Sequence, residues 1–304
     1  QGSYSQVIIT THSPDILRGC GDLERVLILR DGSQLCRLNQ SSQEFIGKRL
    51  RTDLYAALFA DRVLIMEGQT EYGFYPEAAK HWRDLEEASA SGNMAIEATR
   101  TEIVNGDGDQ LPKTISVLRD LGIETGVVMD GDNPQTIQKV ENVCSWVMSL
   151  DQDEAFEGFI AEPISQLDTE DQCEFFCTFL DDGSENINAD GKLHHAFKSL
   201  HGVSAFATYE ENPHRPISTP KDEFQQSFMS NDLVLDEASI TDFLAGHKSV
   251  VGGRLLAHSL RCVLTEVPSR IESVLRFIQG FTSSTLKPGS YCPTKEGLEY
   301  VEGQ

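Results

Sequence analysis

The stretch Arg62-Val63-Leu64-Ile65-Met66-Glu67-Gly68-Gln69-Thr70-Glu71 decides the fold class of the chain. Its apolar run at 63–66 predicts a strand that is buried on both faces, as strands inside a parallel sheet are. Gly68 allows a tight turn there, because it has no Cβ. A helical pattern then begins and has Glu71 in its first turn. We therefore expect Glu67 and Glu71 at the carboxyl end of a buried strand, where open α/β sheets hold their active sites.

A second stretch repeats this design. The apolar run at 125–129 ends in Asp130-Gly131-Asp132, and Asn133-Pro134 then opens a helix. Asp130 and Asp132 are two residues apart, so in extended backbone both side chains point to the same side. If the two strands are parallel neighbours, the four carboxylates of the two stretches meet at one edge of the sheet. So much negative charge in one place favours hard divalent cations, which take oxygen ligands.

The composition limits what the chain can do. Its 304 residues, 39% of them hydrophobic, are enough for two domains or for one domain with a large insertion. It has no run of about 18 apolar residues and no signal-peptide pattern, so we expect no contact with a membrane. The seven cysteines show no metal-finger spacing, which favours reduced thiols in a cytoplasmic protein. The net charge of −23 argues against broad nonspecific affinity for nucleic acid, which needs a basic surface.

The order of the predicted elements indicates parallel βαβ units. Helices at 71–85 and 111–121 alternate with strands at 62–66, 95–104 and 125–129. Further helices are expected over residues 136–150, 154–167, 172–180 and 240–277, the last with breaks at Gly252-Gly253 and Pro268. Polar or irregular segments are expected at 86–92, 181–190 and 208–222.

The segment Val7-Ile8-Ile9-Thr10-Thr11-His12-Ser13-Pro14 is a strand-like run followed by a polar turn. Pro14 suits the first position of a helix, and Ser13 suits the cap before it. The segment resembles the switch-histidine segment of ABC-type ATPases, which implies that His12 senses ATP. The chain has no Gly-x-x-x-x-Gly-Lys-Ser/Thr loop for the phosphates. We therefore expect ATP to act only through a missing ATPase domain, with His12 serving in the full-length protein.

Three motifs, in order, carry a second resemblance. They are a strand that ends in Glu67-Gly68 with Glu71 four residues after Glu67, the turn Asn105-Gly106 after the next strand, and a strand that ends in Asp130-Gly131-Asp132. Together they resemble a Toprim domain, and they are most similar to the overcoming lysogenization defect (OLD) family of ATP-dependent nucleases. The resemblance implies an α/β fold, with a Toprim (Rossmann-like) parallel sheet flanked by helices and an added, mostly helical subdomain.

The resemblance divides the chain into four expected parts. Residues 1–60 are a remnant of the end of an ABC-type ATPase, with a connecting hairpin and helix. Residues 61–165 are the Toprim catalytic core, and residues 166–280 are a helical subdomain or insertion that completes the site. Residues 281–304 are rich in Gly and Ser with little periodicity, so we expect a poorly ordered tail there.

The OLD resemblance also implies an activity: a metal-dependent DNA endonuclease that nicks or cleaves DNA by two-metal hydrolysis of phosphodiester bonds. Two Mg²⁺ or Mn²⁺ ions are expected in each active site, and Ca²⁺ can take the same places. Carried over by position, Glu67, Asp130 and Asp132 hold one metal, and Glu71 helps to hold the second. These four acids are the catalytic residues that the strand-end motifs provide.

The family has a further metal-binding acid and a catalytic cation outside these motifs. Glu157 follows Ser145-Trp146 in the order that the family shows, so the resemblance assigns it to the second metal, with Glu154 and Glu162 as competitors. Lys248 precedes a long helix near the end of the chain, as the family's lysine does. It is expected to neutralise the charge that builds on the phosphate.

Two other functions stay open. One is a Toprim topoisomerase- or primase-like unit, although strand passage needs a catalytic tyrosine and further domains, of which the chain shows no sign. The other is a non-catalytic regulatory domain, in which the acids hold a structural metal ion. The expected partner is DNA. The family implies a homodimer for the full-length protein, whereas we expect a monomer for this fragment.

Overall fold

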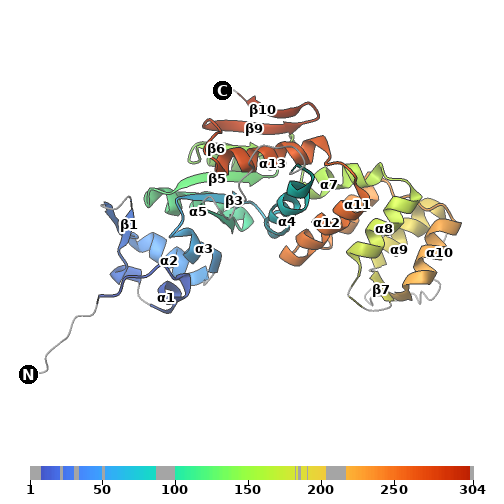
Figure 1. Ribbon diagram of the computed structural model, residues 1–304, viewed down its shortest axis with the longest axis horizontal. Coiled ribbons are helices and arrows are strands. Elements are labelled where there is room, and N and C mark those ends of the chain that lie inside the picture. The colour runs from blue at the N-terminus through green and yellow to red at the C-terminus, as the bar shows by residue number, and fades with distance from the viewer. Residues whose placement is uncertain are drawn as a thin grey trace, which may run out of the picture.

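The computed structural model describes residues 8–20, 23–30, 34–49, 52–86, 100–181, 183, 186–189, 191–202 and 217–301. A six-stranded sheet has helices on both faces, and further helices extend from one side of it (Figure 1). In spatial order the strands are β10 (Gly297–Val301), β9 (Gly289–Thr294), β6 (Trp146–Ser149), β5 (Glu124–Met129), β3 (Arg62–Met66) and β4 (Thr101–Asn105). All pairs are parallel except β9 with β10. The predicted α/β fold class is confirmed.

Helices cover the two faces of the sheet and create two cores. One face packs against α4 (Gln69–Glu86) and α13 (Ser269–Thr282), and the other packs against α5 (Leu111–Asp120) and α6 (Pro134–Glu141). Strand β3 contributes to both cores: Leu64 and Met66 belong to the first, and Val63 and Ile65 to the second. The side chains alternate because successive residues of a strand point to opposite faces. The apolar run is therefore buried on both sides, as predicted.

The parallel register brings the carboxyl ends of the three neighbouring strands to one edge. Met66 of β3 pairs with Asn105 of β4 on one side and with Val128 of β5 on the other. Glu67 follows β3 directly, and Asp130 follows β5 directly. The amide of Glu67 also donates to the carbonyl oxygen of Val128 over 3.0 Å. The first acid of each strand-end motif is thus placed at the same edge by backbone pairing alone.

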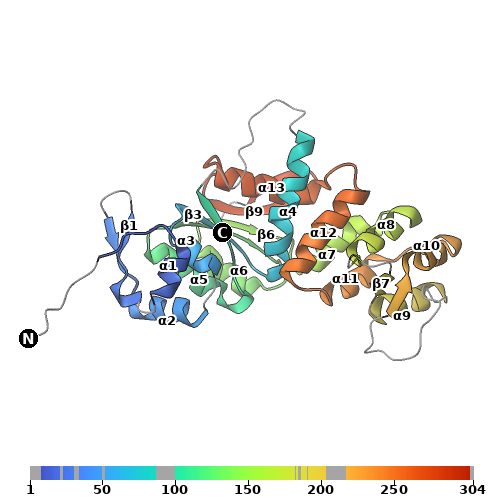
Figure 2. The same ribbon diagram turned by 60° about the horizontal axis from the view of Figure 1, so that its bottom comes forward.

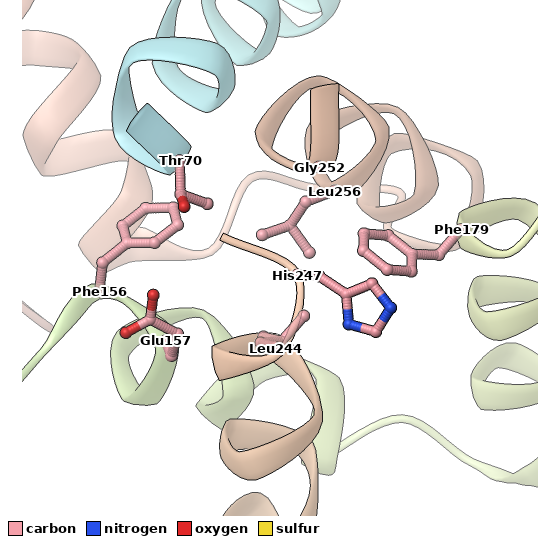
Figure 3. Close-up of a pocket in the computed structure, with 8 residues that line it drawn as sticks. All are labelled: Thr70, Phe156, Glu157, Phe179, Leu244, His247, Gly252 and Leu256. Carbon is pink, nitrogen blue, oxygen red and sulfur yellow. The ribbon is translucent and has the colours of Figure 1, made fainter. Parts of the chain in front are cut away.

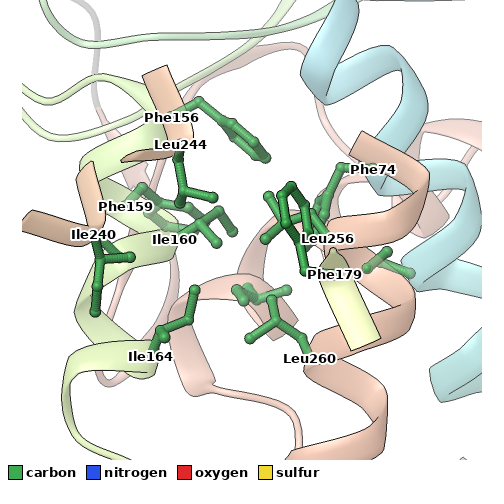
Figure 4. Packing of buried hydrophobic residues seen from close by; sticks show 14 of the residues in the cluster. Phe74, Phe156, Phe159, Ile160, Ile164, Phe179, Ile240, Leu244, Leu256 and Leu260 are labelled. Atoms are coloured by element: carbon green, nitrogen blue, oxygen red, sulfur yellow. The ribbon is translucent and has the colours of Figure 1, made fainter. Parts of the chain in front are cut away.

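The added part is mostly helical, as expected. It contains α7 (Phe156–Ser165), α8 (Thr169–Phe179), α9 (Gly191–His201), α10 (Lys221–Ser230), α11 (Glu237–Ala245) and α12 (Val250–Val263), with a small antiparallel pair of β7 (Asn186–Ala189) and β8 (Ile217–Pro220). Phenylalanines fill its core, among them Phe159 and Phe179, which lie among aliphatic side chains in Figure 4. Each fully buried phenylalanine contributes about 1.5–3 kcal/mol of hydrophobic stabilisation. Among the described residues, every helix falls short of the length or the apolar character that a membrane crossing requires.

Helices α4 and α12 lie side by side because two glycines let their backbones touch (Figure 2). A Cβ on Gly73 would lie 2.1 Å from the carbonyl oxygen of Val250, and a Cβ on Gly253 would lie 2.1 Å from that of Thr70. The predicted break at Gly252-Gly253 is therefore wrong, since α12 continues through both residues. The contact sets the start of α12 against the start of α4.

Three further sequence predictions are wrong. Residues 136–150 do not form one helix: α6 ends at Glu141, and 146–149 form β6, whose Val147 and Met148 face opposite cores. Residues 289–301 are not a poorly ordered tail, because they add β9 and β10 to the sheet. The segments at 181–190 and 208–222 include β7, β8 and the start of α10. Residues 87–99, which hold most of the predicted polar loop and the start of a predicted strand, lie outside the described residues.

The N-terminal part packs against the second core. It consists of α1 (Pro14–Gly19), β1 (Ile28–Arg30), β2 (Gln34–Cys36), α2 (Gln40–Arg49) and α3 (Thr52–Ala57), and β1 and β2 form the predicted hairpin. Ser13 caps α1 by accepting from the amide of Ile16, and Pro14 takes the first helical position, as expected. Leu17, Leu38 and Ile46 join the core beneath α5.

Candidate metal centre

Backbone amides hold the first two acids in place. The amide of Asp130 donates to Oε2 of Glu67 over 2.8 Å, which ties the end of β5 to the end of β3. The amide of Phe156, at the start of α7, donates to Oδ1 of Asp130 over 3.0 Å. Gly131 cannot carry a side chain, since a Cβ there would lie 1.7 Å from the carbonyl oxygen of Asp151. The conformation of the Asp-Gly-Asp turn therefore requires glycine at its middle position.

Glu71 lies in the first turn of α4, and its side chain folds back toward Gly68. A Cβ on Gly68 would lie 2.7 Å from Oε2 of Glu71, so the glycine leaves space for this carboxylate. Only 7% of Glu71 is exposed. Burial, helped by the charges of Glu157 and Glu67, raises the pKa of Glu71 to about 7, although its own backbone amide and Lys248 act in the opposite direction.

Asp130 lies close enough to four other acids for the charge of each to act on its carboxylate. Burial raises the pKa of Asp130 to about 8, together with the charges of Glu71, Glu67, Glu157 and Asp132. Burial also raises the pKa of Glu67; the amide of Asp130 opposes this shift, and the charge of Asp132 adds to it. The structure thus brings all five predicted acids into one electrostatic cluster, of which Asp132 is the most exposed member.

Lys248 reaches this cluster from the other side. Its Nζ forms an ion pair with Oε2 of Glu157 at 2.9 Å. Glu157, in the first turn of α7, is 5% exposed, whereas the side chain of Lys248 is 57% exposed. Burial acts against the charge of Lys248, but the contact with Glu157 and the charges of Asp130 and Glu71 outweigh it and raise the pKa of Lys248. The lysine therefore keeps its charge beside the acids.

A small internal space lies beside Glu157. It is lined by Thr70, Phe156, Glu157, Phe179, Leu244, His247, Gly252 and Leu256 (Figure 3). Its volume of about 10 Å³ holds no more than one water molecule. This space is too small for an organic substrate, so any substrate would reach the acids from the surface where Asp132 and Lys248 are exposed.

The other candidates lie elsewhere. Glu154 and Glu162, which compete with Glu157 in the sequence, both bind the guanidinium of Arg270. His12 precedes α1, and its ring centroid lies 6.3 Å from that of Phe59. His12 therefore belongs to the N-terminal part.

Comparison with known proteins gives one family match. Residues 58–132 match the family described as overcoming lysogenization defect protein-like, TOPRIM domain. They form an OLD-like Toprim domain. Two solved structures of the C-terminal region of the Xanthomonas campestris pv. campestris OLD protein are weakly similar: the one phased with iodine has 14% identity, covers 74% of this chain and 97% of that chain, and has a TM-score of 0.37. The one phased with platinum has 12% identity, covers 74% of this chain and 95% of that chain, and has a TM-score of 0.36. No curated protein matches the chain.

The Toprim domain supplies only part of the acid cluster. The strand-end motifs with Glu67 and Asp130 lie within residues 58–132, but Glu157 and Lys248 come from helices beyond them. The α4–α12 contact brings Lys248 to the domain, and the start of α7 brings Glu157. The cluster is therefore complete only when the added helices pack onto the Toprim sheet.

Sequence reasoning missed two residues at this Toprim edge. Asp109 follows β4, and its charge raises the pKa of Glu67. The run of Asp and Gly after Asn105 could have indicated that Asp109 lies near Glu67, because β4 ends at the same edge of the sheet as β3. Tyr75, one helical turn after Glu71, is fully buried, and burial together with the charge of Glu71 raises its pKa well above the usual value. Nothing in the sequence distinguishes Tyr75 from an ordinary core residue.

The Toprim acids fit a hard divalent cation. Their donor atoms are carboxylate oxygens, the set that Mg²⁺ and Mn²⁺ take. Burial raises the pKa values of Glu71 and Asp130, and the repulsion among the carboxylates in the absence of a cation raises them further. Within the described ranges, no three His, Cys, Asp or Glu side chains are already arranged as a ligand group. The carboxylates would therefore have to turn toward an ion as it binds.

We expect the metal-free protein to lose stability as the pH rises from about 4.5 to about 8. The folded state holds protons on Glu71 and Asp130 up to about pH 7 and pH 8, whereas the unfolded chain releases them near pH 4. Because the folded state binds more protons in this window, the free energy of unfolding falls as the pH rises. The two shifts together correspond to at most about 7 kcal/mol between pH 5 and pH 8.5, measured as urea unfolding in EDTA at these two pH values.

Glu71→Gln should flatten this pH dependence. Glu266→Gln, at an exposed acid between α12 and α13, should leave it unchanged. A stability that is level or rising across the window in the wild type would contradict the raised pKa values.

Proposed function

We propose that this chain is a metal-dependent DNA endonuclease that nicks or cleaves DNA by hydrolysis of phosphodiester bonds. The observation that carries the proposal is the cluster of five acids with one lysine at the carboxyl edge of the sheet. Mg²⁺ or Mn²⁺ ions, two per site, would be held by Glu67, Glu71, Asp130, Asp132 and Glu157, and they would polarise the phosphodiester and activate water. The OLD-like Toprim domain supports DNA as the substrate.

The residues of the chain have separate tasks in this proposal. The amides of Asp130 and Phe156 each hold one oxygen of Glu67 and Asp130, so each carboxylate has one anchored oxygen while its other oxygen would turn toward an ion. Lys248 carries a positive charge at the exposed side of the cluster, where a phosphate would arrive. A fixed cation that faces developing negative charge stabilises the transition state. Bound cations would also offset part of the net charge of −23, which otherwise repels DNA.

Incubation of supercoiled plasmid with the chain in Mg²⁺, Mn²⁺ or EDTA tests the proposal. We expect nicked and then linear DNA with the metal ions and intact plasmid in EDTA. Absence of cutting with every ion would reject the endonuclease and favour a non-catalytic regulatory domain. DNA left covalently attached to protein would instead favour strand passage by a topoisomerase-like unit.

Lys248→Ala should slow plasmid nicking by roughly 10²-fold, the usual loss when one stabilising group at a developing charge is removed. Its affinity for Mn²⁺ should stay the same or increase, because Glu157 loses the cation that it now binds. Quantitative nicking assays and calorimetric Mn²⁺ titrations measure the two effects. Lys139→Ala, at an exposed lysine of α6, is the matched control and should change neither value. A loss of Mn²⁺ affinity in Lys248→Ala would contradict this role.

A further inference from the structure

Tyr75 is a fully buried tyrosine whose hydroxyl is left without a partner. Within the described part of the chain, its oxygen has no hydrogen bond, although the side chain is 0% exposed. The ring is held edge-to-face by Phe74 at 5.2 Å and by Phe156 at 5.8 Å, both between ring centroids. Phenylalanine would make the same ring contacts and would not bury a polar atom. A buried hydroxyl without a partner destabilises a fold, so its presence needs an explanation.

The position of Tyr75 relates it to the acid cluster. It lies four residues after Glu71 on α4, so the two side chains share one face of the helix. Its ring contacts Phe156, whose amide holds Oδ1 of Asp130. The charges of Glu71, Asp130 and Glu154 all act on its phenol group. Tyr75 therefore lies behind the carboxylates, on the side away from solvent.

We propose that Tyr75 is a positioning residue of the metal centre, whose hydroxyl donates its one hydrogen bond to the carboxylate of Glu71 or of Asp130 when these acids are charged and hold cations. The bond is direct or passes through one buried water. Carboxylates that hold metal ions are themselves held by hydrogen bonds from the groups behind them, and these bonds fix their orientation. Tyr75 is the buried donor that the fold places there. The inference rests on the proposed metal centre and does not depend on cleavage of DNA.

Tyr291 provides a matched comparison. It is a second mostly buried tyrosine, in β9, but its hydroxyl donates to the carbonyl oxygen of Lys287 over 2.7 Å. Its hydrogen bond therefore supports the fold in the absence of metal. Removing the hydroxyl of Tyr291 should lower the thermal stability of the metal-free protein, whereas removing that of Tyr75 should not.

The experiment compares wild type, Tyr75→Phe and Tyr291→Phe in calorimetric Mn²⁺ titrations and in thermal unfolding with EDTA. We expect Tyr75→Phe to bind Mn²⁺ roughly 10- to 100-fold more weakly, the usual effect of losing a partner behind a metal ligand. Its Tm in EDTA should equal or exceed that of the wild type. Tyr291→Phe should show the reverse: unchanged Mn²⁺ affinity and a lower Tm.

Two results would overturn the inference. One is a Tyr75→Phe protein that binds Mn²⁺ as tightly as the wild type; the other is one with a lowered Tm in EDTA, which would make the hydroxyl a support of the fold. A wild type that binds Mn²⁺ but leaves plasmid intact would reject the endonuclease alone, with the role of Tyr75 still decided by the titrations. A wild type that binds no Mn²⁺ would reject both proposals.

Discussion

Replacing Asp130 by asparagine should lower the rate of metal-dependent plasmid nicking by about 10³-fold or more, a loss of ~4 kcal/mol of transition-state stabilisation. The charges of Glu67, Glu71 and Glu157 all act on Asp130, so Asp130 would be one of the residues that hold the metal ions. Asparagine has nearly the same shape and can still accept the hydrogen bond from Phe156. The substitution therefore removes charge and leaves the turn intact. Gel assays at saturating Mg²⁺ measure the rate.

The control for this substitution lies in the same region of the chain. Asp153 is exposed and has a φ of 63°, a left-handed conformation that asparagine tolerates well. Asp153→Asn changes the net charge by the same amount and should nick at the wild-type rate. Asp130→Asn should also be more stable than the wild type in EDTA at pH 8.5, because it removes a charge that is buried and repelled by the neighbouring acids. Wild-type nicking by Asp130→Asn would reject the proposed site.

Replacing Arg270 by methionine should lower the free energy of unfolding by about 3 kcal/mol. Its side chain is 11% exposed and binds Asp151, Glu154 and Glu162, and its Nε donates to the carbonyl oxygen of Pro293 in β9 over 3.3 Å. Methionine keeps the apolar length of the side chain, but it leaves three carboxylates close together without the cation that binds them all. Urea unfolding in EDTA at pH 7 measures the loss.

Arg276 on the same helix is the natural control. Its side chain is 61% exposed, and its ion pair with Glu272 is one turn away on α13. Exposed pairs of this kind contribute about 0.5 kcal/mol or less, so Arg276→Met should unfold almost as the wild type does. Equal losses in the two variants would show that the Arg270 cluster stabilises the fold no more than a surface pair.

The strand-end acids were predictable because their signals are local. An apolar run, an acid and a glycine stand next to one another in the sequence, and parallel pairing then aligns the strand ends. Glu67 and Asp130 therefore follow from short-range patterns. The resemblance to the OLD family then pointed to Glu157 and Lys248, which no local pattern marks.

The remaining features depend on contacts between distant segments. The run 146–149 is short and apolar, which suits a strand or a helix equally, and its pairing with β5 and β9 decides between them. The sequence around Gly253 favours a helix break, but in the fold this glycine lies inside α12, where it allows close contact with α4. Arg270 and Tyr75 have an ordinary appearance in the sequence, and only burial beside acids from other elements distinguishes them.

Strand β9 completes the sheet from far along the chain, with Tyr291 opposite Met148. During synthesis at roughly 5–20 residues per second, β6 leaves the ribosome on the order of ten seconds before its partner does. For that time one side of β6 offers unpaired amides and carbonyls to any neighbouring nascent chain. Weaker expression, which keeps fewer nascent chains near one another during this interval, should therefore raise the yield of native protein.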